Sequence, residues 1–231
     1  MKTIGLIGGM SWESSLEYYR VINETVKSRL GGFHSAQCVM YSVDFAEIEA
    51  LQHRGEWPET ARILSRAARG LEAAGADFIV LCTNTMHKVA AEVEAAVRIP
   101  LLHIADPTAE RIKGRGFRKV GLLGTRFTME EGFYRGRLAE KHGLEVIVPE
   151  SEDRETVHRV IYEELVAGRI EAASRAAFVS IIERLAGAGA EAVILGCTEI
   201  GLLVGGKDSP LPVFDTTRIH AEAAVDLALR A

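Results

Sequence analysis

The chain has few cysteines and no closely spaced cysteine pair. Its 231 residues contain three, Cys38, Cys82 and Cys197, without the CxxC spacing of a structural zinc site. An odd number of isolated thiols also excludes a disulfide framework as the basis of the fold. A reducing, cytoplasmic location is therefore expected.

An excess of positive charge and a long apolar run are also missing. The net charge is −5, and no stripe of Lys and Arg is present, which argues against a nucleic-acid partner. Apolar runs such as FIVLC end after a few residues, so no membrane span is predicted. The apolar start of the chain runs into Gly8 and Gly9 without the cleavage pattern of a signal peptide.

Several motifs of catalysis and cofactor binding are absent. The sequence contains neither HExxH nor GxSxG, so neither a metal site nor a serine hydrolase is predicted. The glycines Gly5, Gly8 and Gly9 do not form GxGxxG, and no acidic residue is placed to bind a ribose. A tight strand-to-helix turn is favoured over a dinucleotide site.

What the chain does contain is a repeat. The stretch AGADFIVLCTNT (74–85) matches AGAEAVILGCTE (188–199), so that Thr83 aligns with Cys197. IGLIGGMSWESSLEYYR near the start is echoed by VGLLGTRFTMEEGFYR, and IPLLHIAD by LPVFDT. Three matched segments in one order indicate a duplicated unit of about half the chain, too long for a solenoid repeat.

Each half is predicted to form an α/β lobe with a four-stranded parallel sheet. Short apolar runs bounded by turn residues alternate with patterns of helical period, which implies parallel strands joined by right-handed crossovers. The predicted strands are Thr3–Ile7, Gln37–Val43, Asp77–Cys82, Leu101–Ile104, Lys119–Leu123, Leu144–Val148, Glu191–Leu195 and Pro212–Phe214.

Three helices have clear sequence signals. Apolar residues recur at helical spacing after a possible Ser11 cap and again before Gly75, while Thr128 followed by Glu131 predicts a capping box. The two apolar series are Trp12, Leu16, Tyr19, Ile22 and Val26, and Ile63, Leu64, Ala67, Ala68 and Leu71.

Candidate site residues lie where the predicted strands end. Ligands of open parallel sheets bind beyond the carboxyl ends of the strands. Cys197 lies at such an end, where helix-start N–H groups are expected to lower its pKa, and it is the candidate catalytic thiol. Because successive strand residues point to opposite faces, Cys82 is expected to pack away from the site if Thr83 faces it. Cys38 is expected in the core.

The other polar residues give weaker signals. His87 is expected on the first turn of a helix beside the site, but packing is the favoured role for it and for His53, His103 and His220. The polar run from Asp44 to Glu56 either reaches the site or forms a solvated helix face, and the sequence leaves both open.

The motifs CTNTMH, GCTEIGLL and GLIGGMSWESS, in a doubled α/β layout, resemble the aspartate/glutamate racemase family across essentially the whole chain. The resemblance implies two pseudo-symmetric lobes with the active site in the cleft between them. It also implies that the last helix returns to the first lobe, which gives lobes of 1–98 plus 210–231 and of 99–209. A homodimer is the family's usual state.

The resemblance implies a racemase without a cofactor, which uses one cysteine from each lobe to remove and return the α-proton. Here the family's first motif, Cys-Asn-Thr, reads Thr83-Asn84-Thr85, whereas Cys197 is retained. A threonine hydroxyl is a far weaker acid than a thiol, so the two directions are expected to be unequal. This departure resembles the subgroup of L-aspartate/glutamate-specific, or broad-specificity, amino-acid racemases, in which Cys197 would act on the L enantiomer.

The resemblance also implies how an amino acid would bind. Hydroxyls and amides of the strand ends would hold the α-carboxylate, and Met10 and Gln52 would line the pocket together with Glu199. The carboxylate donors are Asn84, Thr85, Thr125 and Thr198. Where family members specific for aspartate have a lysine, this chain reads IYEEL with Glu163 and Glu164, so the binder of the side-chain carboxylate is not identified.

Two other functions remain open on the sequence. Related decarboxylases and cis-trans isomerases use cysteine chemistry in the same fold, and a single thiol suits protonation from one side. Alternatively, the chain is a non-catalytic amino-acid-binding protein that lost activity together with the first cysteine.

Overall fold

The computed structural model describes residues 1–230 and divides into two compact units. The first comprises residues 1–104 together with the end of the chain from His220, and the second comprises 105–219. The division expected from the sequence (1–98 plus 210–231, and 99–209) places both boundaries between the units earlier in the chain. The difference arises because the fourth strand of each half pairs with the third strand of that same half.

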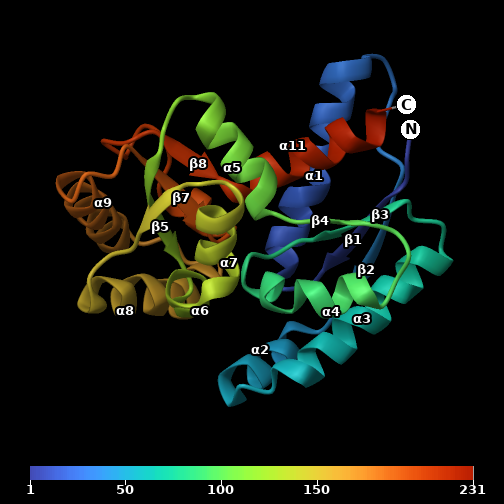
Figure 1. Cartoon of the computed structure of the whole chain (residues 1–231), viewed down its shortest axis with the longest axis horizontal. Helices are drawn as coiled ribbons and strands as arrows, with labels where there is room; N and C mark the ends of the chain where they lie inside the picture. The colour runs from blue at the N-terminus through green and yellow to red at the C-terminus, as the bar shows by residue number, and fades with distance from the viewer. Residues whose placement is uncertain (231) are drawn as a thin grey trace. The chain divides into compact units, whose positions relative to one another are not determined.

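Each unit contains one four-stranded parallel sheet (Figure 1). The first unit has β1 (Ile4–Gly8), α1 (Trp12–Leu30), β2 (Cys38–Ser42), α2 (Phe45–Arg54), α3 (Trp57–Ala73), β3 (Phe78–Leu81), the 3₁₀ helix η1 (Thr85–Val89), α4 (Ala90–Ala95) and β4 (Leu101–Leu102).

The second unit contains a further set of elements, of which the last helix continues into the first unit. They are α5 (Ala105–Gly114), β5 (Lys119–Gly124), α6 (Arg126–Glu130), α7 (Gly132–Gly136), the π-helical turn η2 (Arg137–Lys141), β6 (Glu145–Ile147), α8 (Ser151–Val160), the π-helical turn η3 (Ile161–Leu165), α9 (Ala172–Gly187), β7 (Ala192–Gly196), α10 (Ile200–Leu203), β8 (Val213–Asp215) and α11 (Thr216–Leu229).

The two sheets share one topology. Their strand orders are β2-β1-β3-β4 and β6-β5-β7-β8, and all neighbours are parallel. The first strand of each half therefore lies between the second and the third, as duplication requires. The expected fold class, two α/β lobes each built on a four-stranded parallel sheet flanked by helices, is confirmed.

Helices cover both faces of the first sheet (Figure 1). On one face, Tyr18 and Ile22 of α1 and Ala224 and Val225 of α11 pack with buried residues of β1 and β3. On the other face, α2, α3 and α4 supply the apolar side chains. The last helix therefore contributes to the core of the first unit, as the family resemblance implied.

The two helices with apolar repeats formed, but they differ in burial. In α3, all five apolar residues of the predicted series are buried. In α1, Ile22 and Val26 are buried, whereas the side chains of Trp12, Leu16 and Tyr19 are 65%, 58% and 50% exposed. The helical period was right for α1, but the first half of its apolar series faces outward.

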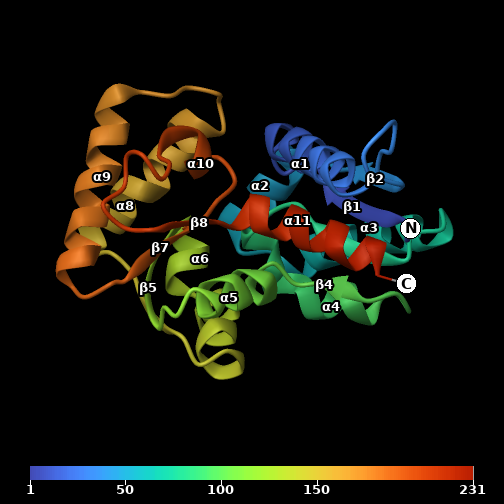
Figure 2. The same ribbon diagram turned by 90° about the horizontal axis from the view of Figure 1, so that it is seen from above.

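In the second unit, α8, α9 and α10 pack on one face of the sheet, while α5 lies on the other (Figure 2). The predicted capping box at Thr128 is wrong. Thr125 is the N-cap of α6, because its Oγ1 accepts from the Thr128 backbone N–H at 3.3 Å. Glu131 precedes the separate helix α7 without a side-chain cap bond.

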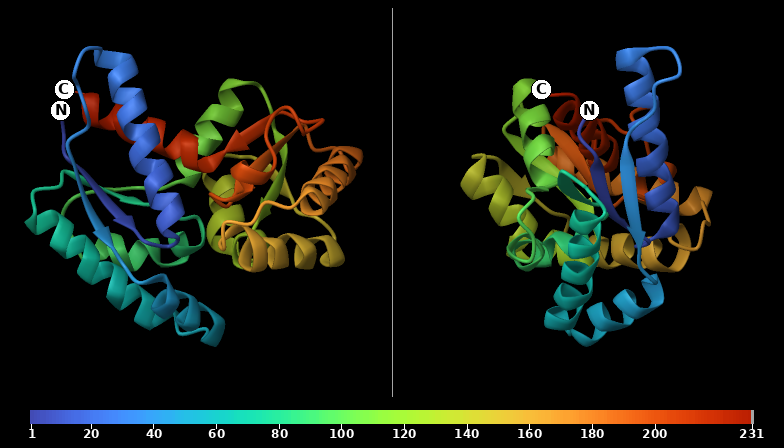
Figure 3. Two further views of the ribbon diagram at one scale, coloured as in Figure 1. Left: turned by 180° about the vertical axis from the view of Figure 1, so that it is seen from behind. Right: turned by 90° about the vertical axis from the view of Figure 1, so that its right-hand side faces the viewer.

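The beginning of the chain lies beside α11 in the first unit, where Lys2 N donates to the Ala228 carbonyl at 2.8 Å (Figure 3). Among residues 1–230, none of the helices combines the length and the apolar character needed to cross a lipid bilayer.

Candidate active site

In the first unit, the candidate residues follow β1 and β3 at one edge of the sheet. Ile7 pairs with Leu81, and Cys82 N donates to the Ile7 carbonyl at 2.9 Å. The chain leaves β1 at Gly9 and β3 at Thr83, so these two segments emerge side by side. This is the carboxyl edge of the sheet, where the sequence predicted a site.

The turn after β1 depends on glycine and on two serines. Gly9 has φ = 91°, and a Cβ there would lie 2.2 Å from the Val43 carbonyl oxygen. The Gly9 N–H donates to Ser15 Oγ at 2.7 Å, and the Ser11 hydroxyl caps α1 by accepting from Ser14 N. The glycines therefore serve a tight strand-to-helix turn, which was the favoured interpretation.

The segment after β3 separates Thr83 from Cys82. Thr83, Asn84 and Thr85 are all buried, and Thr85 begins the 3₁₀ helix η1. The Cys82 side chain is fully buried in the cluster formed with α1 and α11. Burial raises the pKa of the Cys82 thiol. The Cys82 side chain therefore packs in the core with α1 and α11, as expected.

Cys38 differs from expectation. It lies on β2, the edge strand of the first sheet, and is only partly buried against the cluster. An edge strand is covered less completely than a central one, which explains its exposure. Burial still raises the pKa of the Cys38 thiol.

Met10 and Gln52 both reach the apolar cluster on the α2 and α3 side of the sheet. Met10 belongs to that cluster, and the buried Gln52 amide donates to Met86 Sδ at 2.9 Å. Around Gln52, the polar run on α2 is mostly exposed, including Asp44, which caps the helix through Ala46 N. The exposure of this run favours a solvated helix face, with Gln52 as its inward-facing member.

In the second unit, Thr125 and Cys197 follow adjacent paired strands. Gly124 at the end of β5 pairs with Gly196 at the end of β7. A Cβ on Gly196 would lie 2.9 Å from the Leu123 carbonyl oxygen, so glycine permits this close approach. Thr125 is buried, and its Oγ1 lies 3.2 Å from Thr128 Oγ1. This pair reproduces the Ser11 and Ser14 hydroxyls of the first unit, 3.3 Å apart.

Cys197 forms a hydrogen bond with the carboxylate of Glu199, two residues further along the chain. Its partly buried Sγ donates to Glu199 Oε2 at 3.0 Å, and Glu199 is itself buried. Burial and the charge of Glu199 raise the pKa of the Cys197 thiol, whereas the backbone N–H groups of Thr198 and Glu199 lower it. The predicted N–H effect exists, but the expected net lowering is wrong because burial and the carboxylate outweigh it.

Removing the Glu199 charge is expected to make Cys197 more reactive. In Glu199→Gln, the thiol no longer faces an anion, so its pKa falls and its alkylation by iodoacetamide at pH 7.5 accelerates several-fold. Mass spectrometry of the alkylated peptide separates Cys197 from Cys38. Glu163→Gln is the control, because the Glu163 side chain is 63% exposed. An alkylation rate unchanged in Glu199→Gln would contradict the role of the charge.

Three buried histidines, His87, His103 and His220, lie close together in the first unit. Their proximity was not predicted from the sequence. The rings of His87 and His103 have centroids 4.5 Å apart, and those of His87 and His220 are 5.9 Å apart. Their residues lie on η1, after β4 and on α11. Sequence inspection missed this cluster because only the returning helix brings His220 to the first unit.

Both ring nitrogens of His87 contact the backbone. Nδ1 lies 2.8 Å from the Thr83 carbonyl oxygen, and Nε2 accepts from the Ile104 N–H at 3.1 Å. Burial, followed by His103 and His220, lowers the pKa of His87 well below its usual value. Within residues 1–230, no group of three or more His, Cys, Asp and Glu side chains could hold a metal ion.

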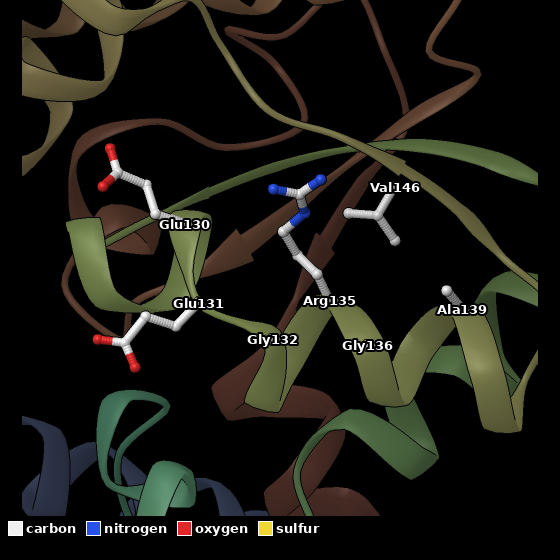
Figure 4. Close-up of a pocket in the computed structure, with 7 residues that line it drawn as sticks. All are labelled: Glu130, Glu131, Gly132, Arg135, Gly136, Ala139 and Val146. Atoms are coloured by element: carbon white, nitrogen blue, oxygen red, sulfur yellow. The ribbon is translucent and has the colours of Figure 1, made fainter.

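The two glutamates of the IYEEL segment differ in their contacts. Glu164 accepts from Ser174 Oγ at 2.5 Å, whereas Glu163 is largely exposed. A surface pocket of about 280 Å³ lies elsewhere in the second unit and is lined by none of the predicted site residues (Figure 4). Arg135 within it donates to the Met129 carbonyl, and Glu130 pairs with Arg154.

Similarity to known proteins covers nearly all of the chain. Residues 7–224 match the sequence profile of the Asp/Glu/Hydantoin racemase family. A broad-specificity amino-acid racemase of Bacillus subtilis is 26% identical over 171 residues, 74% of this chain and 73% of that protein.

Solved structures agree in fold. A candidate Asp/Glu racemase from Yersinia pestis is 60% identical with a TM-score of 0.93, and an aspartate racemase homologue from Pyrococcus horikoshii is 39% identical with a TM-score of 0.86. Both comparisons cover 100% of each chain. Arylmalonate decarboxylase, 14% identical with a TM-score of 0.54, shares only the fold. The chain therefore belongs to the Asp/Glu/Hydantoin racemase family.

Proposed function

We propose that the protein is an amino-acid racemase that needs no cofactor and acts on aspartate, glutamate or a wider range of amino acids, with a bias toward the L enantiomer. The observation that carries the proposal is the partly buried Cys197 thiol just after the end of β7, beside the backbone N–H groups of Thr198 and Glu199, because a thiol in this place can supply a base for the α-proton. The duplicate strand end in the first unit offers Thr83 in the equivalent sequence position.

The proposed reaction begins at Cys197. Its thiolate form removes the α-proton of an L-amino acid. Thr83 Oγ then relays a solvent proton to the opposite face of Cα, and the Cys197 thiol returns its proton to solvent. In the reverse direction Thr83 would have to act as the base, which an alcohol does poorly, so exchange of the α-proton of the D enantiomer is slower than exchange from the L enantiomer.

Binding of the substrate is proposed to use the hydroxyls and amides at the strand ends. Asn84, Thr85, Thr125 and Thr198 would donate to the α-carboxylate and to the charge that develops on deprotonation. Met10 and Gln52 would line the pocket. The related Bacillus subtilis protein is described as having broad specificity, which supports a wider range of side chains than aspartate alone.

Proton NMR in D₂O tests the proposal. L- and D-aspartate, glutamate and homoserine are incubated with the protein, and loss of the α-proton signal is followed. We expect exchange with at least one L-amino acid and slower exchange with its D enantiomer. A ligand that raises the melting temperature without any exchange would instead indicate a binding protein. Turnover of an arylmalonate or of maleate without exchange of amino acids would indicate a related decarboxylase or isomerase.

We also propose that the protein forms a homodimer through α1. Its exposed side chains of Trp12, Leu16 and Tyr19 lie at helical spacing and form one apolar stripe. Replacing Leu16 by Glu is expected to shift the mass in solution from dimer to monomer, measured by light scattering after size exclusion. Ile170→Glu, at an exposed residue of the second unit, is the control and retains the dimer. A monomeric unaltered protein would contradict the proposal.

A further inference from the structure

We infer that His87 is a positioning residue for Thr83: its neutral imidazole joins the Thr83 carbonyl to the Ile104 N–H and so sets the direction of the Thr83 hydroxyl. The inference rests on the proposed racemase function, since it assigns His87 to the first-unit half of the proton transfer. His87 itself does not contact the reacting atoms.

The hydrogen bonds of His87 define its tautomer. Nε2 faces a backbone N–H of Ile104 at 3.1 Å and must therefore accept. Nδ1 faces the Thr83 carbonyl oxygen at 2.8 Å and must therefore carry the proton and donate. A charged imidazolium would have no lone pair for Ile104, so only the neutral Nδ1–H form satisfies both partners.

A second histidine stabilises the segment that His87 uses as its anchor. β4 is only two residues long, so the backbone beyond it has little support from the sheet. His220 Nε2 donates to the Leu102 carbonyl at 2.8 Å, and its Nδ1 accepts from Tyr18 OH at 2.8 Å. Imidazoles therefore hold the backbone on both sides of His103, at Leu102 and at Ile104.

The surroundings of His87 keep it neutral. Its own short helix η1 supplies the carbonyl contact, His103 lies against it from the end of β4, and His220 approaches from α11. Burial and these two histidines lower the pKa of His87 well below its usual value. The bond to Thr83 therefore persists across neutral pH.

Fixing the Thr83 carbonyl also limits the Thr83 side chain. Threonine is branched at Cβ, so its χ1 has few allowed rotamers once the backbone is set. The cysteine of other family members bears a softer, more reactive thiol, whereas a hydroxyl that relays a proton must be oriented closely. His87 supplies that orientation through the backbone.

Two substitutions distinguish the hydrogen bond of His87 to the Thr83 carbonyl from its hydrogen bond to the Ile104 N–H. In His87→Asn, the side-chain amide nitrogen takes the place of Nδ1 and can donate to Thr83. In His87→Gln, the amide oxygen reaches the Nε2 position and can accept from Ile104, but no donor remains at the Nδ1 position. His34→Gln is the control for loss of a histidine, because His34 is exposed.

The measurement compares two rates from one L-amino acid in D₂O. Inversion to the D enantiomer, followed by chiral chromatography, needs both Cys197 and Thr83. Deuterium entering the remaining L enantiomer needs only Cys197. We expect His87→Gln to lower inversion about 10- to 100-fold while L exchange changes by less than about threefold. His87→Asn is expected to retain most of the inversion rate that His87→Gln loses. His34→Gln leaves both rates unchanged. Equal loss of both rates in His87→Gln would overturn the inference.

Nitrogen NMR of the imidazoles tests the inference without reference to activity. Between pH 6 and 8, His87 is expected to show one protonated Nδ1 and one unprotonated Nε2. An Nε2–H tautomer or a charged ring in that range would overturn the inference. If the unaltered protein exchanges no α-proton, the proposed racemase function fails, and a charged ring or the wrong tautomer would then separately refute the bond to Thr83.

Discussion

Replacing Cys197 by alanine is expected to lower exchange of the α-proton of L-amino acids by about 10²- to 10⁴-fold, the range typical of a positioned base. No other thiol can replace it, because Cys82 is buried in the core of the first unit and Cys38 lies on an edge strand. The exchange rate by NMR in D₂O gives the result. The melting temperature of the variant should change little, since Cys197 is only partly buried.

Cys38→Ala is the matched control, because it removes a thiol that lies outside the candidate site. It is expected to leave the exchange rate unchanged. Undiminished exchange in Cys197→Ala would refute the assignment of the base. Equal losses in both variants would indicate that loss of a thiol harms the protein generally and would contradict a specific role for Cys197.

Replacing Thr83 by cysteine is expected to raise exchange from the D enantiomer by about 10²- to 10⁴-fold, since it introduces a group that can act as a base. An alcohol is scarcely ionised near neutral pH, whereas a thiol with an ordinary pKa is a few per cent thiolate. The bond of His87 to residue 83 uses the backbone carbonyl, so it should survive the change. Initial rates of α-proton exchange from each enantiomer, measured by NMR, give the ratio of D to L exchange.

Thr83→Ser provides the comparison for that variant. Serine keeps a hydroxyl at the same position, so the ratio of D to L exchange should remain close to that of the unaltered protein. If Thr83→Cys produces no gain from the D enantiomer, Thr83 does not face the D side of the substrate. The assignment of the first-unit half of the site would then be wrong.

The alternation of short apolar runs with helical periods was enough to predict the sheets. All eight strands formed, and the duplicated topology followed from repeats that align Thr83 with Cys197. The opposite facing of Cys82 also followed, because residues of an extended chain alternate in direction. These features depend on local pattern and on the rules of parallel sheets, and both can be read from a sequence.

Features that depend on competition between neighbours were not predictable. The sign of the Cys197 pKa shift needed the position of the Glu199 carboxylate relative to the thiol. Thr125 rather than Thr128 caps α6, although only Thr128 is followed three residues later by a glutamate. The outward face of Trp12 and the meeting of His87 with His220 required the packing of whole helices.

The order in which the ribosome delivers the chain gives the returning helix α11 a further consequence. Residues 1–104 are synthesised first, yet one face of their sheet lacks Ala224 and Val225 until the whole second unit has been made. The second unit, continuous in sequence, can fold as soon as it emerges. His220, which holds the Leu102 carbonyl at the end of β4, also arrives only with α11. The first unit, which contains Thr83, is thus encoded first and completed last.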